Sequence, residues 1–196
     1  IDSAFNEFDA DAIIRALLPD LLDSEPEALE ILRNAPQNRG EFQRIFATKD
    51  LYNSRIRSYW LRKMENHGRR ERVVVDDYTI EHILPQNPEL SQAWIEMLGP
   101  DWKAIQDKYL HTPGNLTLTG YNSSYSDHPF EYKRSGVQDA AGKPVGFAHS
   151  PLRLNAGLGT HERWDEAAIL ARAQQLHALA QLVGAHPGPL PAAAPF

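Results

Sequence analysis

Two adjacent polar residues, Glu81 and His82, stand at the end of a segment with the composition of a β-strand. A carboxylate is a hard oxygen ligand for a divalent cation, and histidine, which titrates near neutral pH, is suited to take a proton from water. Metal-assisted hydrolysis of a phosphodiester uses both functions. Neighbouring side chains of a regular strand point to opposite faces. The pair therefore serves one site only if the strand twists or bulges at its end, with which Pro85 is compatible.

A second polar pattern decides how the Glu-His pair is interpreted. By itself the pair is also compatible with surface or core residues that have no catalytic role. The segment Gly114-Asn115-Leu116-Thr117-Leu118-Thr119 alternates as a strand does, and Asn122 follows it. Asn115 alone could be a turn residue after glycine, and Asn122 alone could cap a helix. The three motifs in this order favour a catalytic site.

The elements that must position these residues are mostly helices. Apolar residues recur at helical spacing in four segments, which are residues 9–33, 53–66, 89–110 and 164–183. A further helix is expected to begin near Ser126-Asp127-His128-Pro129. Branched and alternating residues predict strands at residues 73–75, 78–84 and 116–119. The sequence thus predicts an α+β protein, mostly α-helical, with one small embedded hairpin.

Composition narrows the class of protein and of metal. The 196 residues include no cysteine, which excludes disulfide frameworks and zinc-thiolate sites. A metal site would have to use oxygen and imidazole ligands, which favours Mg²⁺ or Mn²⁺. No apolar run reaches the roughly 20 residues of a membrane helix, and no secretory leader is recognised. We therefore expect a cytoplasmic protein.

Charge is distributed unevenly along the chain. The formal net charge is −6, yet residues 49–72 carry eight basic residues against three acidic ones. Clustered lysines and arginines supply the phosphate contacts that dominate affinity for DNA. The alternative is a solvated face that pairs with the acidic residues 1–30. The candidate DNA-binding residues are Arg55, Arg57, Arg62, Lys63, Arg69, Arg70, Lys133 and Arg134. For Lys133 and Arg134 a solvated helix end is the alternative.

The combined motifs resemble a known nuclease domain. The pattern Glu81-His82-Ile83-Leu84-Pro85-Gln86, then Gly114-Asn115-Leu116-Thr117-Leu118, then Asn122 and Phe130-Glu131-Tyr132-Lys133-Arg134 is similar to the C-terminal HNH (ββα-metal) domain of GmrSD-type restriction enzymes. The same domain type occurs in SspE-like phage-defence proteins. The resemblance covers about residues 50–180 and implies a ββα-metal nuclease core within the mostly helical fold.

The resemblance implies a role for each matching residue. His82 would be the general base and Glu81 a ligand of the divalent metal. Asn115 would brace the loop that carries the base, and Asn122 would supply the second metal ligand. The family usually has aspartate where this chain has Glu81, which puts the ligand set in doubt. His111, beside the Gly-Asn motif, and His128 are further candidates, although a surface role is favoured for His128.

The resemblance also implies a domain organisation and a function. The HNH core would span residues 76–135 with a helical insertion at 86–111. The flanking parts would be an N-terminal helical segment (1–48), a basic helix and linker (49–75), a C-terminal loop and packing helix (136–183) and a Pro/Ala-rich tail (184–196). We expect an endonuclease that nicks or cuts double-stranded DNA under the control of an N-terminal nucleotide-hydrolysing or modification-sensing domain. The alternative is a decayed HNH domain that only binds DNA or docks a protein.

Overall fold

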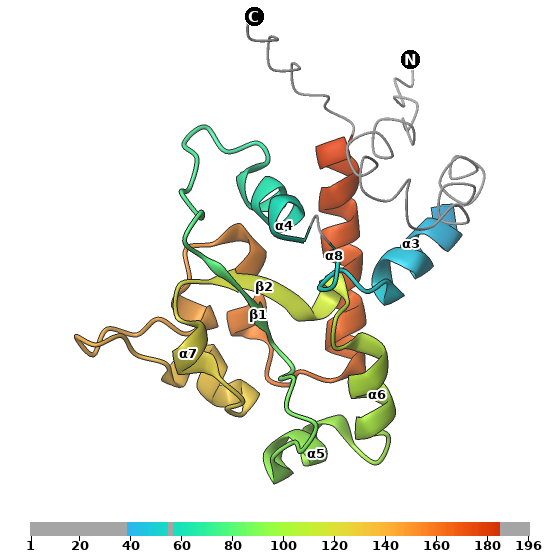
Figure 1. Cartoon of the computed structure of the whole chain (residues 1–196), viewed down its shortest axis with the longest axis vertical. Coiled ribbons are helices and arrows are strands. Elements are labelled where there is room, and N and C mark those ends of the chain that lie inside the picture. Colours follow the sequence, from blue (N-terminus) through green and yellow to red (C-terminus); the bar gives the residue numbers. More distant parts are fainter. Residues whose placement is uncertain (1–38, 55–56, 185–196) are drawn as a thin grey trace, which may run out of the picture.

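A two-stranded antiparallel sheet lies at the centre of the molecule (Figure 1). The computed structural model describes residues 39–54 and 57–184. Strand β1 (Thr79–His82) pairs with β2 (Leu116–Thr119), and the register sets His82 opposite Leu116. All four residues of β2 are buried, whereas β1 becomes buried only at its last two residues. The end of β1 that carries Glu81 and His82 is therefore the end enclosed by the protein.

Helices and short turns surround this sheet. Helices α5 (Gln92–Leu98) and α6 (Trp102–Tyr109) come between the two strands in the sequence. In Figure 1 they lie below the sheet. The other α-helices are α3 (Arg39–Thr48), α4 (Arg57–Asn66), α7 (Asn122–Tyr125) and α8 (Glu166–Gly184). Short turns complete the chain: the 3₁₀ segments η2 (Pro113–Asn115), η4 (Phe147–His149), η5 (Arg153–Asn155) and η6 (Leu158–Thr160), and the π-helix η3 (Tyr132–Gly136). None of the helices in the described part is long and apolar enough to cross a bilayer.

Within the described residues, the expected helices are present with shifted ends. The segment 89–110 is divided into α5 and α6 because Gly99, at φ +83°, ends α5 in a conformation that favours glycine. Helix α8 begins at Glu166, two residues after the expected start. The helix expected near Ser126 begins at Phe130, directly after Pro129, and continues as the π-helix η3, while Ser126 itself follows the short α7. The helix expected at residues 9–33 lies outside the described residues.

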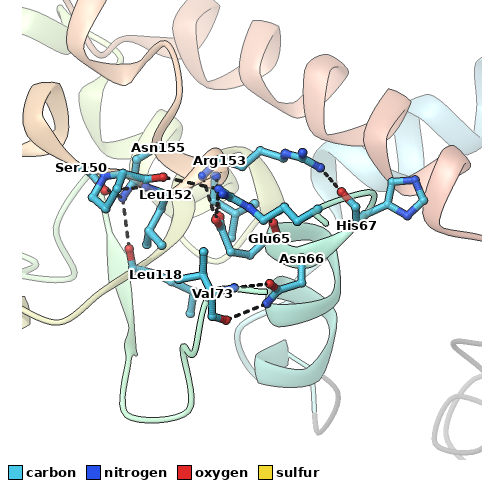
Figure 2. Close-up of polar contacts among 12 residues, drawn as sticks. Glu65, Asn66, His67, Val73, Leu118, Ser150, Leu152, Arg153 and Asn155 are labelled. Atoms are coloured by element: carbon cyan, nitrogen blue, oxygen red, sulfur yellow. Dashed lines mark hydrogen bonds and ion pairs between the residues drawn. The ribbon is translucent and has the colours of Figure 1, made fainter. Parts of the chain in front are cut away.

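The strand predicted at residues 73–75 does not form, which corrects the sequence interpretation. The backbone of Val73 bonds to a side chain instead of a neighbouring strand (Figure 2). The Asn66 amide accepts from the Val73 N–H (2.8 Å) and donates to its carbonyl oxygen (3.1 Å). A strand needs a partner for its backbone groups, and here one asparagine at the end of α4 satisfies both.

Two groups of buried apolar side chains hold the elements together. The first contains Trp94, Phe130 and Trp164 and packs α5, η3 and the start of α8 around the residues that follow β1. The second packs α4 and α8 against β2 through Trp60 and Leu118, among others. The sheet thus lies between two packed layers, and helix α8 contributes to both.

A buried carboxylate ties α4 to the segment after η4. Glu65 is fully buried and accepts the backbone N–H groups of Arg153 and Leu154, both at 2.9 Å, and an ion pair from Arg69 at 2.6 Å. Figure 2 shows Glu65 below Arg153, beside the contact between Arg153 and the His67 carbonyl. A buried charge with three donors is compensated rather than costly. Glu65 therefore fixes α4 to the turn η5 beside β2.

Candidate active site

His82 lies at the end of β1 with both ring nitrogens engaged. Only 5% of its surface is exposed. Its Nε2 is 3.1 Å from Nδ1 of His111, and its Nδ1 is 2.6 Å from the amide nitrogen of Gln86. The ring of Tyr52 contacts the imidazole edge-on with ring centroids 4.5 Å apart. Because Gln86 is exposed, the Nδ1 side of His82 is the side closest to solvent.

The surroundings of His82 favour its neutral form. Burial lowers the pKa of the imidazole to about 3, and the nearby His111 and Lys133 act in the same direction. Desolvation has this effect because the charged imidazolium loses more hydration than the neutral ring. At neutral pH His82 is therefore uncharged and carries a lone pair that can accept a proton.

Glu81 forms a buried ion pair with Lys133. The ammonium Nζ lies 2.7 Å from Oε1 of Glu81 and also donates to the carbonyl oxygens of His82 (2.9 Å) and Ile83 (3.2 Å). Both side chains are almost fully enclosed. Burial raises the pKa of Glu81 to about 7, and the Lys133 charge opposes that shift. Lys133 thus connects η3 to the residues around the end of β1.

The two members of the Glu-His pair have different partners. The β1–β2 register is regular as far as His82, and adjacent strand residues point to opposite faces. Glu81 contacts Lys133 on η3, whereas His82 contacts His111 after α6. The twist or bulge that would direct both side chains into one site is not formed within β1.

Asn122, the predicted second metal ligand, is the first residue of α7. Its amide nitrogen donates to the carbonyl oxygen of Ile80 (3.0 Å) and to Oγ1 of Thr79 (3.2 Å). These bonds attach α7 to β1. Helix α7 has no side-chain cap, so the capping alternative for Asn122 is wrong.

The donor set fits a divalent cation poorly as it stands. Oε1 of Glu81 is already neutralised by an ammonium group, and the Asn122 amide is committed to strand β1. Within the described residues no three His, Asp or Glu side chains gather into a potential ligand cluster. A cation held by Glu81 would have to compete with Lys133, so the described residues present no ready-made metal site.

Asn115 uses its whole amide to fix the segment after His82. It is fully buried, and its Oδ1 accepts the N–H of Leu84 (2.7 Å) and the indole N–H of Trp164 (3.2 Å). Its Nδ2 donates to the carbonyl oxygens of Leu84 (3.0 Å) and Leu110 (2.9 Å). The Asn115 amide thus pairs with the backbone N–H and carbonyl of Leu84, as a neighbouring strand would. It also bonds to Leu110, so it fixes the backbone after His82 and the backbone before His111.

The turn that carries Asn115 is itself held by helix α8. A Cβ atom on Gly114 would lie 2.4 Å from the carbonyl oxygen of Ile169, so only glycine allows this close approach. The buried Arg172 donates to the carbonyl oxygens of Pro113, Gly114 and Leu116 at 2.9–3.1 Å. Burial lowers the pKa of this guanidinium to about 9. Arg172 fixes the turn with hydrogen bonds to neutral carbonyl groups.

Comparison with protein-family models identifies the chain. Residues 37–179 match the model described as GmrSD restriction endonucleases, C-terminal domain. The chain belongs to this family. No curated protein and no solved structure matched it. The match spans β1, β2 and the helices around them, so the site described above lies within the GmrSD C-terminal domain.

The predicted DNA-binding residues of this GmrSD domain are only partly at the surface. Lys133 is fully buried by Glu81 and two carbonyl groups, so its predicted phosphate contact is wrong. Arg69 is paired with the buried Glu65, and Arg62 with Asp76 at 3.3 Å. Two of the predicted arginines are thus already paired with carboxylates of the protein.

The remaining basic residues differ in exposure. Arg57 donates to the Tyr52 carbonyl at 2.7 Å and lies over the Tyr52 ring, and Arg134 donates to the carbonyl of His161 at 2.9 Å. Lys63 and Arg70 are exposed, so they remain candidates for DNA contact. Arg55 lies outside the described residues.

Several residues that shape the site carry little indication in the sequence. Tyr52 and Gln86 contact the imidazole of His82, but neither has a pattern that predicts this contact. Arg172 carried a usable indication, because it is three residues after Ile169 and four before Leu176 and so lies on the apolar face of α8. A lone arginine on such a face predicts a buried guanidinium with a backbone or acidic partner.

Proposed function

We propose that this chain is an HNH-type endonuclease domain that nicks or cuts duplex DNA as the effector of a modification-dependent restriction or phage-defence protein. Membership of a restriction endonuclease family supports a nuclease role. The observation that carries the proposal is the placement of His82, whose Nδ1 lies 2.6 Å from the amide of the exposed Gln86, on a segment held by four hydrogen bonds of Asn115. A fixed imidazole with an accepting nitrogen towards solvent is placed as a general base must be.

The chemistry follows from the position of that nitrogen. A water molecule that replaces the Gln86 amide at Nδ1 gives up a proton to His82 and attacks the phosphorus. The new phosphorus–oxygen bond forms as the bond to the 3′ oxygen breaks, and the departing oxygen takes a proton from solvent. The products are a 5′-phosphate and a 3′-hydroxyl. A DNA phosphate beside His82 also favours the protonated ring and raises its pKa towards neutrality.

The proposal includes a divalent cation, Mg²⁺ or Mn²⁺, as cofactor, and regulation by an N-terminal nucleotide-hydrolysing or sensing domain of the same polypeptide. When bound, such a cation would neutralise charge on the departing oxygen. To bind the cation, Glu81 would have to exchange its contact with Lys133 and Asn122 its bond to β1. Chelation by EDTA tests the requirement directly.

One observation favours a second function. The ammonium of Lys133 lies on the carboxylate that would have to bind the cation, and that carboxylate belongs to glutamate where aspartate is usual. A domain in which this pair has replaced the metal would keep its shape and its DNA surface but would not hydrolyse DNA. The alternative is therefore a decayed nuclease domain that serves as a DNA-binding or protein-docking module.

Supercoiled plasmid separates the two functions. The chain is incubated with plasmid in Mg²⁺ or Mn²⁺, with and without EDTA, and DNA binding is measured in parallel by gel shift. Open-circle or linear product that disappears with EDTA supports the endonuclease. Binding without any conversion supports the module.

A further inference from the structure

His111 is held from two sides beside the proposed base. It lies after α6, and its carbonyl oxygen accepts the N–H groups of Leu51 (2.9 Å) and Tyr52 (3.2 Å). Its ring stacks on Tyr52 with centroids 5.2 Å apart and an angle of 12° between the planes. The backbone bonds and the stacking give the imidazole of His111 a fixed position and orientation.

The direction of the hydrogen bonds around His82 can be followed from the Gln86 amide. An amide NH₂ group donates and does not accept. Its position 2.6 Å from Nδ1 makes that nitrogen the acceptor. The proton of the neutral His82 ring then lies on Nε2, which faces Nδ1 of His111 at 3.1 Å. Nδ1 of His111 accepts a hydrogen bond from this N–H group.

We propose that His111 is a positioning residue that holds His82 in the tautomer with the proton on Nε2. This inference rests on the proposed function in that it assigns Nδ1 as the nitrogen that receives the proton from water. A histidine used as a base needs its other nitrogen occupied by a fixed partner, because that bond sets the tautomer and the ring orientation. That partner is here a second histidine.

The competing explanation is that His111 only fills space against Tyr52. Two substitutions separate the explanations because each keeps one property. His111→Asn offers Oδ1 near the place of Nδ1, so it keeps the acceptor and loses the stacked ring. His111→Phe keeps the stacked ring and loses the acceptor. If His111 positions the base, His111→Asn is the milder change, and if it only packs, His111→Phe is the milder one.

Nitrogen-15 NMR of the 196-residue chain labelled in its histidines reads the tautomer without requiring activity. Two-bond ¹H–¹⁵N correlations show which ring nitrogen carries the proton, and the signals of His82 are identified by their loss in His82→Gln. Because the Gln86 amide also favours this tautomer, the His111 variants are compared in a Gln86→Ala background. We expect the Nε2–H form in the unaltered chain, in Gln86→Ala and in Gln86→Ala/His111→Asn, and a mixture of both tautomers in Gln86→Ala/His111→Phe. A proton on Nδ1 of His82 in the unaltered chain overturns the proposal, as does an unchanged single tautomer in Gln86→Ala/His111→Phe.

Plasmid nicking by the same variants adds the catalytic readout. We expect His111→Asn to stay within about tenfold of the unaltered chain and His111→Phe to lose on the order of 100-fold, the lower end of what general-base catalysis contributes. The opposite ranking overturns the proposal. If the unaltered chain does not cut DNA, the proposed function fails, while the NMR result still decides whether His111 sets the tautomer.

Discussion

The ammonium of Lys133 lies 2.7 Å from Oε1 of Glu81, and both groups are buried. The pair joins the π-helix η3 to the end of β1 and to the residue that follows it, because Lys133 also bonds to the carbonyl oxygens of His82 and Ile83. The chemistry of the site is therefore linked to its stability. A change in either partner is expected to affect the segment that carries His82 as well as any cation bound there.

A double-mutant cycle measures this link. Lys133→Met leaves the Glu81 carboxylate buried without its partner, and breaking such a pair costs about 3–5 kcal/mol. Glu81→Gln alone leaves the ammonium with its two carbonyl acceptors. The double variant should lose less free energy of unfolding than the sum of the singles, by at least about 1 kcal/mol. Denaturant unfolding at pH 8 provides the values, and simple additivity would show that the two groups do not interact.

The pH dependence of stability reports the burial of His82. Its pKa is about 3 in the folded chain and 6.5 as an ordinary value, so the unfolded state takes up a proton first as the pH falls. Because the pKa is lowered, the contribution of His82 to the free energy of unfolding is fully present above pH 6.5 and decreases below it. The free energy of unfolding of the unaltered chain relative to His82→Gln should fall by up to about 1.4 kcal/mol per pH unit in this range.

The relative measurement is needed because Glu81 acts in the opposite direction. Its raised pKa, about 7, makes the folded state bind a proton more readily than the unfolded state. Lowering the pH therefore stabilises the folded state through Glu81. Both forms of the chain contain Glu81, and the comparison removes most of its contribution. His149→Gln, at an exposed position, is the matched control. A constant difference between pH 7 and pH 4 would contradict the burial of His82.

Asn115 should contribute more to stability than an ordinary buried amide. Asn115→Ala leaves the Leu84 and Trp164 donors and two carbonyl groups without their partner, and each buried unsatisfied group costs about 1–3 kcal/mol. We expect a loss of at least about 3 kcal/mol. Asn122→Ala, which removes bonds from a half-buried position, should cost about 1 kcal/mol. Equal losses in thermal or denaturant unfolding would show that Asn115 does not brace the segment.

Gln86 should not be required for cleavage. Its amide nitrogen occupies the lone pair of Nδ1 that water must reach, and the side chain is exposed and able to move. Gln86→Ala removes that competitor, so nicking should be as fast as in the unaltered chain or up to about fivefold faster, the value of one net hydrogen bond. Initial rates of plasmid relaxation test this. A loss as large as that of His82→Ala would assign Gln86 a role in the reaction itself.

The sequence predicted the local parts of this fold better than the long-range ones. Strand β2 and the helices α5, α6 and α8 follow from alternation and helical spacing, which are properties of neighbouring residues. Val73 has the side chain of a strand residue, but a strand depends on a distant partner, and Asn66 takes that place. Pattern alone does not show which backbone groups will be satisfied by a side chain.

The same distinction explains the errors at the site. Lysine at a helix end is ordinarily solvated, and the burial of Lys133 depends on its meeting Glu81, which is 52 residues away in the sequence. The motif placed Glu81 and His82 side by side, whereas the regular register of β1 directs them to different partners. The types and order of His82 and Asn115 carry the pattern, and the structure places Asn115 against the segment that follows His82. His111 and Gln86 become important only through distances that the sequence does not contain.

The initial rate of plasmid relaxation by His82→Ala, relative to the unaltered chain and to His149→Ala, tests the central claim most directly. All three proteins are compared at equal concentration in Mg²⁺ and in Mn²⁺, with their DNA binding measured by gel shift. Loss of a general base predicts that His82→Ala is slower by at least about 100-fold, with unchanged binding, while His149→Ala keeps the rate of the unaltered chain. A His82→Ala protein that relaxes plasmid as fast as the unaltered chain would contradict the assignment of His82 as the base.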